Sequence, residues 1–239
     1  MPARSRFVAA ATAALFAVPS LAACSGDEPD AAEAKAPEEV LAQASDTLAG
    51  TSGVYLRLAA SALPEGVSGI AKAAGTVTDA PAFDGSISVV FAGQTVDVPV
   101  ISVDDTVFAQ LPFTGGAWDK VNPKEYGAPD PTDLVGADGF PGLLKLTDSP
   151  EAGESVRGGS DNSDILTTYS GTLPGAAMDA IIPSSAGDTF DVEWQVNDDG
   201  ELTKATMTGV FYPRTDPMTY TVEFSDYGST KDITAPAGP

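Results

Sequence analysis

Alternation of apolar and polar residues, which begins after Gly53 and returns in most later segments, is the feature that most constrains the fold. In VYLRLAA, Val54, Leu56 and Leu58 fall on one side of an extended chain, because successive side chains of a β-strand point to opposite faces. The same pattern recurs in further segments, at residues 86–93, 95–103, 105–111, 165–173, 190–196, 201–212 and 218–227. About nine or ten strands at this close spacing predict an antiparallel meander.

Helical patterns are few and short. Pro37 suits the first position of a helix whose apolar face is Leu41, Ala44 and Leu48 and which Gly50 ends. Further helical turns are predicted at about residues 131–135, 140–146 and 174–182. A sheet with a few helices clustered on it is an α+β arrangement.

The second face of several predicted strands carries small, uncharged side chains, as at Ser86, Ser88 and Val90. This pattern fits a strongly curved sheet, a half-barrel, with short helices across its concave side and an apolar cavity between them. It also fits an ordinary packed core, because periodicity does not distinguish a cavity from a filled interior. Both interpretations therefore stay open on the strand pattern alone.

The first two dozen residues are typical of an export signal. Arg4 and Arg6 precede an apolar stretch at residues 7–18, which is shorter than the roughly 20 residues that span a bilayer. The chain from Cys24 to Ala36 consists mainly of small and charged residues with one proline and predicts a flexible tether. We therefore expect a lipoprotein signal peptide at 1–23, a tether at 24–36 and a single domain at 37–239.

Cys24 is the only cysteine of the chain, so it can form neither an internal disulfide nor a four-cysteine zinc site. Leu21, Ala22 and Ala23 precede it, and an apolar residue followed by two small ones makes this a lipobox. The sequence predicts a diacylglyceryl cysteine as the new N-terminus. Two or three acyl chains, such as palmitate, hold a protein on a membrane stably, whereas one chain does so only marginally.

Composition excludes several classes of function. The chain contains no histidine, which removes the commonest general base and metal ligand. The adjacent carboxylates at 104–105 and 198–199 lie in predicted turns, where Asp is favoured for backbone reasons. Loss of Arg4 and Arg6 would move the formal charge from −22 to −24, which argues against nucleic acid as a partner. We expect no enzyme, no cofactor and no metal site.

Four segments carry a resemblance to a known family: GTVTDAPAFDGSISVVFAG, AWDKV before PDPTDLV, GFPGLLKL, and the closing YTVEFSDYGSTKDITAPAGP. Together with the lipobox, tether and opening helix, they resemble the mycobacterial LppX/LprA/LprF/LprG lipoproteins over residues 37–239, with LprG the member of closest likeness. The resemblance implies a curved antiparallel sheet backed by helices around an apolar cavity. It also implies carriage of acylated lipids or glycolipids through the cell envelope.

Of the family's functional residues only Cys24 carries over, as the lipid-modified position. The cavity lining is inferred instead from strand alternation and from the helical segments over the opening. The candidates are Val54, Leu56, Leu58, Ile87, Val89, Phe91, Val96, Val98, Leu134, Phe140, Leu143 and Leu144.

The expected protein is a monomeric lipid carrier, anchored through Cys24 to the extracytoplasmic face of the plasma membrane. Its partners would be an acylated lipid or glycolipid and, where transfer requires one, a membrane transporter or an envelope acceptor protein. One alternative is a solidly packed interaction lipoprotein that recruits another envelope protein. A hydrolase acting through an Asp pair is the third and weakest hypothesis.

Overall fold

The structure is a computed structural model that describes residues 35–126, 128–159, 162–179 and 181–237. Cys24 and the predicted leader and tether up to Ala34 lie outside the described residues. By its contacts, the segment from Lys35 to Pro239 makes one compact unit, and the following description concerns this unit.

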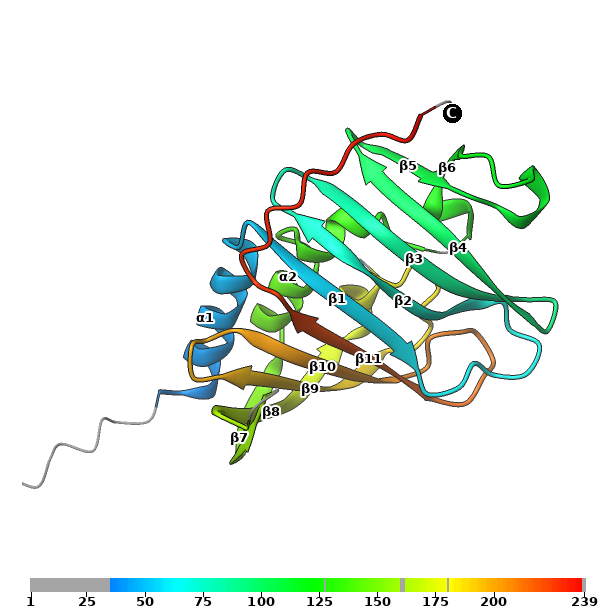
Figure 1. Ribbon diagram of the computed structural model, residues 1–239. Coiled ribbons are helices and arrows are strands. Elements are labelled where there is room, and N and C mark those ends of the chain that lie inside the picture. The colour runs from blue at the N-terminus through cyan, green and yellow to red at the C-terminus, as the bar shows by residue number, and fades with distance from the viewer. Residues whose placement is uncertain (1–34, 127, 160–161, 180, 238–239) are drawn as a thin grey trace, which may run out of the picture. The chain divides into compact units, whose positions relative to one another are not determined.

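A single open sheet of eleven strands dominates the unit (Figure 1). Every pair of neighbouring strands is antiparallel. The strands are β1 (Gly53–Ala60), β2 (Gly69–Thr78), β3 (Ala82–Phe91), β4 (Gln94–Val103), β5 (Thr106–Ala109), β6 (Asp119–Val121), β7 (Asp148–Gly158), β8 (Asp164–Pro174), β9 (Thr189–Asn197), β10 (Leu202–Gly209) and β11 (Met218–Ser225).

The sheet consists of two meanders joined through one long-range strand pair. Strands β1 to β6 follow one another along the sheet, as do β7 to β11, and β1 pairs with β11 between them. Leu56 lies opposite Phe224 in this central pair. The N-terminal and C-terminal halves of the domain therefore share one continuous surface.

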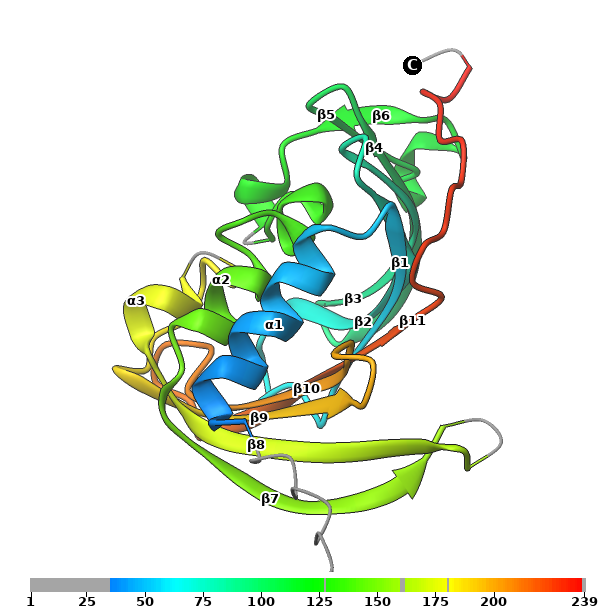
Figure 2. The ribbon, with the colours of Figure 1, turned by 90° about the vertical axis from the view of Figure 1, so that its left-hand side faces the viewer.

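The sheet is strongly curved, and α1 (Pro37–Ala49) and α2 (Phe140–Lys145) lie on its concave side (Figure 2). Pro37 occupies the first turn of α1, and the acidic Glu38 and Glu39 follow it, where the positive end of the helix dipole favours them. The helix buries Leu41, Ala44 and Leu48, and each leucine is worth about 2 kcal/mol of transfer free energy.

The remaining helical elements are single turns on loops. They are η1 (Pro112–Thr114), η2 (Pro123–Tyr126), η3 (Pro131–Val135) and α3 (Gly175–Met178). On the convex side, the segment after β11 runs along the outside of the sheet, and Lys231 Nζ pairs with Asp84 Oδ2 at 2.7 Å (Figure 2).

The predicted fold is confirmed in class and curvature, with two differences in detail. The sheet has eleven strands rather than nine or ten, because β2, β6 and β7 lack the alternation that identified the others. The last of the predicted helices, at 174–182, is confined to α3. The hairpin turns at Asp104–Asp105 and at Asp199–Gly200 form as predicted, and all of these residues except Asp199 have a positive φ.

Candidate functional site

The concave face of the sheet is the apolar surface on which the helices lie, and the strand registers define it. Leu58 is opposite Val222 on β11 and Ala73 on β2, and Ala73 is opposite Ile87 on β3. Across the other half, Val222 continues through Ala205 and Trp194 to Tyr169. This row therefore carries small or apolar side chains and one tyrosine from β8 to β3.

Helix α2 closes the concave face over β9 to β11. Phe140, Leu143 and Leu144 are almost fully buried and belong to the same apolar cluster as the inward residues of these strands. The Phe140 ring meets the Phe224 ring edge-on at a centroid distance of 5.1 Å. Here the helix and the sheet are packed directly against each other, as in an ordinary protein interior.

A buried hydrogen-bond chain fixes the end of α2 to the sheet. The indole Nε1 of Trp194 donates to Thr147 Oγ1 at 2.9 Å, and Thr147 Oγ1 donates to the carbonyl of Leu143 at 3.0 Å. Trp194 has no exposed surface. A buried indole N–H without an acceptor is costly, so this chain fixes where α2 ends.

The position of α2 relative to α1 is fixed by a second buried contact. Ser45 Oγ donates to the carbonyl of Pro141 at 2.7 Å, and Lys145 pairs with Asp46 at 2.7 Å on the exposed side of the same helix pair. Because the serine bond is buried and the ion pair is solvated, the serine bond is the stronger constraint.

The η3 turn lies against β2 and β3 and is attached to the sheet by one carboxylate. Asp130 Oδ1 accepts from Ser102 Oγ at 3.0 Å, from the Thr132 amide at 3.0 Å and from Thr132 Oγ1 at 2.8 Å. Ser102 is a buried polar residue on the concave face of β4. Partial burial and the neighbouring Asp130 raise the pKa of Asp133 above its ordinary value. Leu134 in this turn packs, half-buried, against the apolar cluster.

Beyond the helices, toward the end of the sheet where β1, β3 and β10 finish, the concave face is incompletely covered. Leu58, Ile87, Val89 and Val96 are all half-buried, whereas Val54 and Leu56, further back along β1, are buried. Val89 lies opposite Val96, and Ile87 lies opposite Val98. We call this end the loop end, defined by the connections at residues 61–68, 92–93 and 210–217.

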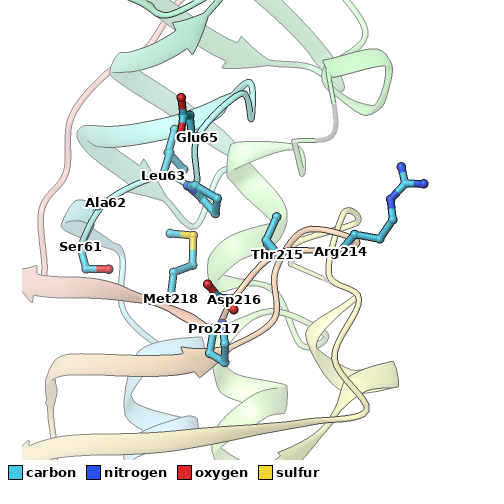
Figure 3. Close-up of a pocket in the computed structure, with 10 residues that line it drawn as sticks. Ser61, Ala62, Leu63, Glu65, Arg214, Thr215, Asp216, Pro217 and Met218 are labelled. Atoms are coloured by element: carbon cyan, nitrogen blue, oxygen red, sulfur yellow. The ribbon is translucent and has the colours of Figure 1, made fainter.

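An open pocket of about 440 Å³ lies at the loop end between the β1–β2 and β10–β11 loops (Figure 3). Met218, which is 6% exposed, points into the space between these loops, and Leu63 lies across from it. Arg214 points away from the pocket (Figure 3). A second pocket, of about 660 Å³, lies by β6 and η2 and includes Leu111, Val121 and Tyr126.

Two tyrosines hold the β10–β11 loop against the start of β2. Tyr220 Oη donates to the carbonyl of Ile70 at 3.0 Å, so the 2.9 Å bond between the two hydroxyls has Tyr212 as its donor. A Cβ on Gly69 would overlap Tyr212 Oη, so a larger residue there would displace that hydroxyl. Burial, with the neighbouring Tyr212 hydroxyl, raises the pKa of Tyr220 far above its ordinary value.

The structure places the predicted cavity residues in three environments. Val54, Leu56, Val98, Phe140, Leu143 and Leu144 are buried in the apolar cluster, and Leu58, Ile87, Val89, Val96 and Leu134 are half-buried. Phe91 is 69% exposed at the end of β3. Whether this set lines a lipid cavity stays a prediction, and Cys24 lies outside the described residues.

Sequence reasoning did not single out Met218 or Leu63 at the loop-end pocket, nor the Tyr212–Tyr220 pair. The alternation of β11 places Met218 and Tyr220 on the concave face, but which strand end borders an opening depends on tertiary structure. The Asp pairs at 104–105 and 198–199 are exposed in hairpin turns. Among the described residues, no group of three or more Cys, Asp or Glu is placed to hold a metal ion.

The fold and its concave face define an α+β half-barrel, an open curved sheet with short helices across an apolar hollow side. LprF and LppX are among the solved structures that share this fold. LprF from Mycobacterium bovis aligns with a TM-score of 0.68 at 17% identity, covering 84% of this chain and 97% of that one. Lipoprotein LppX from Mycobacterium tuberculosis aligns with a TM-score of 0.60 at 18% identity, covering 83% and 98%.

The chain belongs to the LppX_LprAFG lipoprotein family, because the sequence profile of that family matches residues 36–234. This confirms the expected family, while the closer likeness to LprG stays a prediction. A search of curated protein sequences found no match. None of the helices in the described part of the chain is long and apolar enough to cross a membrane.

Proposed function

We propose that this lipoprotein binds acylated lipids or glycolipids on the concave face of its sheet and carries them through the cell envelope. The proposal rests on one observation at the loop end of that face: inward residues such as Ile87, Val89 and Val96 are apolar yet only half-buried. Apolar side chains that point into a hollow and lack full cover provide a surface for a ligand of the same chemistry.

The energetics of the role require apolar contact and no catalytic group. Moving a 16-carbon acyl chain from a membrane into water costs on the order of 12 kcal/mol, at roughly 0.8 kcal/mol per methylene. A carrier must offset nearly all of this with apolar walls. The inward rows of β1 to β4 have that character, and the polar head of the lipid would stay at the loop end.

The proposed location is the extracytoplasmic face of the plasma membrane. The lipobox at residues 21–24 and the lipoprotein family both support an anchor at Cys24, with two or three acyl chains for stable attachment. Residues 24–36 would be the tether, and 37–239 would form the single lipid-binding domain. A transporter or an acceptor protein would complete the transfer route.

A second candidate function is an interaction module that recruits another envelope protein. The observation that favours it is the close packing of α2 on the sheet, where Phe140, Leu143 and Leu144 are buried among sheet residues. A domain that is packed solidly throughout would have a structural role and would bind no lipid.

A pair of variants on one strand tests the lipid-binding proposal. Val89→Trp places a bulky ring on the concave face, whereas Val90→Trp places the same ring on the convex face, and both native residues are half-buried. A ring that displaces about three methylenes of a bound chain removes roughly 2.4 kcal/mol, which is a loss of affinity of about fifty-fold. The assay is uptake of a pyrene-labelled diacylglycerol by the soluble form without Cys24. Equal uptake by both variants, or no uptake by the wild type, would contradict the proposal.

A further inference from the structure

The β3–β4 hairpin ends in an exposed aromatic residue. Phe91 pairs with Gln94 as the last residue pair of the ladder, and Ala92 and Gly93 form the turn with φ values of 51° and 77°. The Phe91 side chain is 69% exposed, the most exposed of the large apolar side chains in the described residues. In Figure 1 this hairpin is at the right, at the loop end of the sheet.

The hairpin tip is also free of charge in a strongly acidic chain. The protein has 34 Asp and Glu residues, yet residues 85–96 contain neither these nor Lys or Arg. Asp97 is the first charged residue along β4, and its Oδ1 accepts from Ser88 Oγ on the convex side at 2.5 Å. Charged groups are costly to move into a bilayer interface, and their absence here removes that cost.

The tip is continuous with the half-buried apolar face behind it. Val89 lies opposite Val96 directly behind the Phe91–Gln94 pair, and Ile87 lies opposite Val98 further back. A lipid chain that left a bilayer at Phe91 would therefore meet apolar side chains on the concave face at once.

The predicted anchor constrains where the domain can be. From Cys24 to Pro37 the chain can span at most about 45 Å, at roughly 3.3–3.6 Å per residue. A domain held this close to a bilayer meets it at high effective concentration, which strengthens even a single apolar contact with the bilayer.

We propose that the tip of the β3–β4 hairpin, residues 91–94, docks on the lipid bilayer by inserting Phe91 into its apolar boundary. The inference deepens the proposed function, because it names the bilayer as the partner of the loop end. Docking turns the half-buried face of Val89 and Val96 toward the membrane from which a lipid is taken. The contact is apolar, so it is insensitive to salt, unlike one made by basic residues.

The test uses the single thiol of the chain. A form of the protein that begins at Cys24 is coupled through that thiol to a maleimide-headgroup lipid in phosphatidylcholine vesicles. Phe91→Trp reports insertion by a blue shift and by quenching from brominated phosphatidylcholine, above the background of Trp118 and Trp194. Val156→Trp is the matched control, since Val156 is 53% exposed on the distant edge strand β7.

We expect brominated lipid to quench Phe91→Trp but not Val156→Trp. We also expect this quenching to be the same at 0.1 and 1 M salt, because salt screens interactions between charges and not an apolar contact. Equal quenching of the two variants, or none at Phe91→Trp, would overturn the proposal. Phe91→Asp in the coupled protein should slow lipid pickup from the same vesicles by about tenfold or more, the loss expected when one Phe side chain leaves an apolar phase.

The outcomes separate docking from carriage. If Phe91→Trp is quenched but the protein takes up no lipid, the protein docks on the bilayer without being a carrier. The proposed function is then wrong and the docking proposal stands. If the protein takes up lipid but Phe91→Trp is not quenched, the protein is a carrier. The docking proposal is then wrong and the proposed function stands. If sedimentation shows a dimer that Phe91→Asp dissociates, the tip contacts a second copy and the bilayer proposal is wrong.

Discussion

The hydrogen-bond chain from Trp194 through Thr147 to Leu143 holds α2 over the concave face, and its removal gives a measurable loss of stability. Trp194→Phe keeps an aromatic ring in the core but deletes the indole N–H that donates to Thr147 Oγ1 at 2.9 Å. Both residues are buried, so water does not replace the lost partner.

The magnitude follows from two contributions. A buried hydrogen bond contributes about 1 kcal/mol net, and the volume lost when indole becomes phenyl leaves a small cavity worth about 1–2 kcal/mol. Together they lower the free energy of unfolding by about 2–3 kcal/mol. For a domain of about 200 residues this lowers Tm by roughly 5–10 °C.

Two further variants isolate the hydrogen bond from the cavity. Thr147→Val keeps the side-chain shape but leaves the Trp194 N–H buried without a partner, at a cost of about 1–3 kcal/mol. Trp194→Phe combined with Thr147→Val should cost about 1 kcal/mol less than the sum of the single variants, because the double variant has no orphaned donor.

Urea unfolding followed by circular dichroism measures all three free energies. Asp46→Ala is the control, because its ion pair with Lys145 is half to three-quarters exposed and should contribute no more than about 0.5 kcal/mol. If Trp194→Phe proves as mild as Asp46→Ala, or if the double variant shows no coupling, the chain does not hold α2 in place.

Three more outcomes are expected. Tyr220→Phe removes the acceptor of Tyr212 and the donor to the Ile70 carbonyl, so it should lower the free energy of unfolding by about 1–2 kcal/mol. It should also speed amide hydrogen exchange at the start of β2. Unchanged exchange there would show that the tyrosine pair does not hold the loop. Ser102→Ala deletes one of the three bonds to Asp130, and we expect a loss of about 1 kcal/mol in thermal unfolding; no loss would mean that the bond does not attach η3. Cys24→Ala should move the protein expressed in its host from the detergent phase to the aqueous phase of a Triton X-114 partition, and continued detergent partitioning would contradict the anchor.

Strong local patterns made much of the fold predictable. The Pro37 start and Gly50 stop of α1 are local signals that tertiary packing does not override. The alternation of β9 and β11 is equally local, because the inward residues of these strands are aliphatic or aromatic throughout.

The strands that were not predicted have physical reasons to lack a pattern. In β2 the inward position at Gly75 carries no side chain because the Phe83 ring occupies that space, 2.5 Å from where a Cβ would be. Strand β7 is an exposed edge strand with two register shifts, and it carries Glu, Ser and Gly instead of alternating apolar residues. Such an edge discourages pairing with other chains. The β1–β11 pair joins distant parts of the sequence, and no local signal encodes it.

The candidate site was predictable in its chemistry but not in its geometry. Alternation placed Ile87, Val89 and Phe91 on one face, yet it could not show that β3 ends at Phe91 and leaves that ring in solvent. It also could not separate Val54, which lies deep in the cluster, from Val89 at the open end. Both distinctions depend on where the helices lie over the sheet.

The central claim is that the concave face holds lipid tails, and the most direct measurement is mass spectrometry of lipids extracted from the soluble form without Cys24, expressed in its own host. The proposal predicts a co-purified acylated lipid that Val89→Trp abolishes and Val90→Trp retains. A wild-type domain that is folded and yields no lipid would contradict it, and would favour the solidly packed interaction module instead.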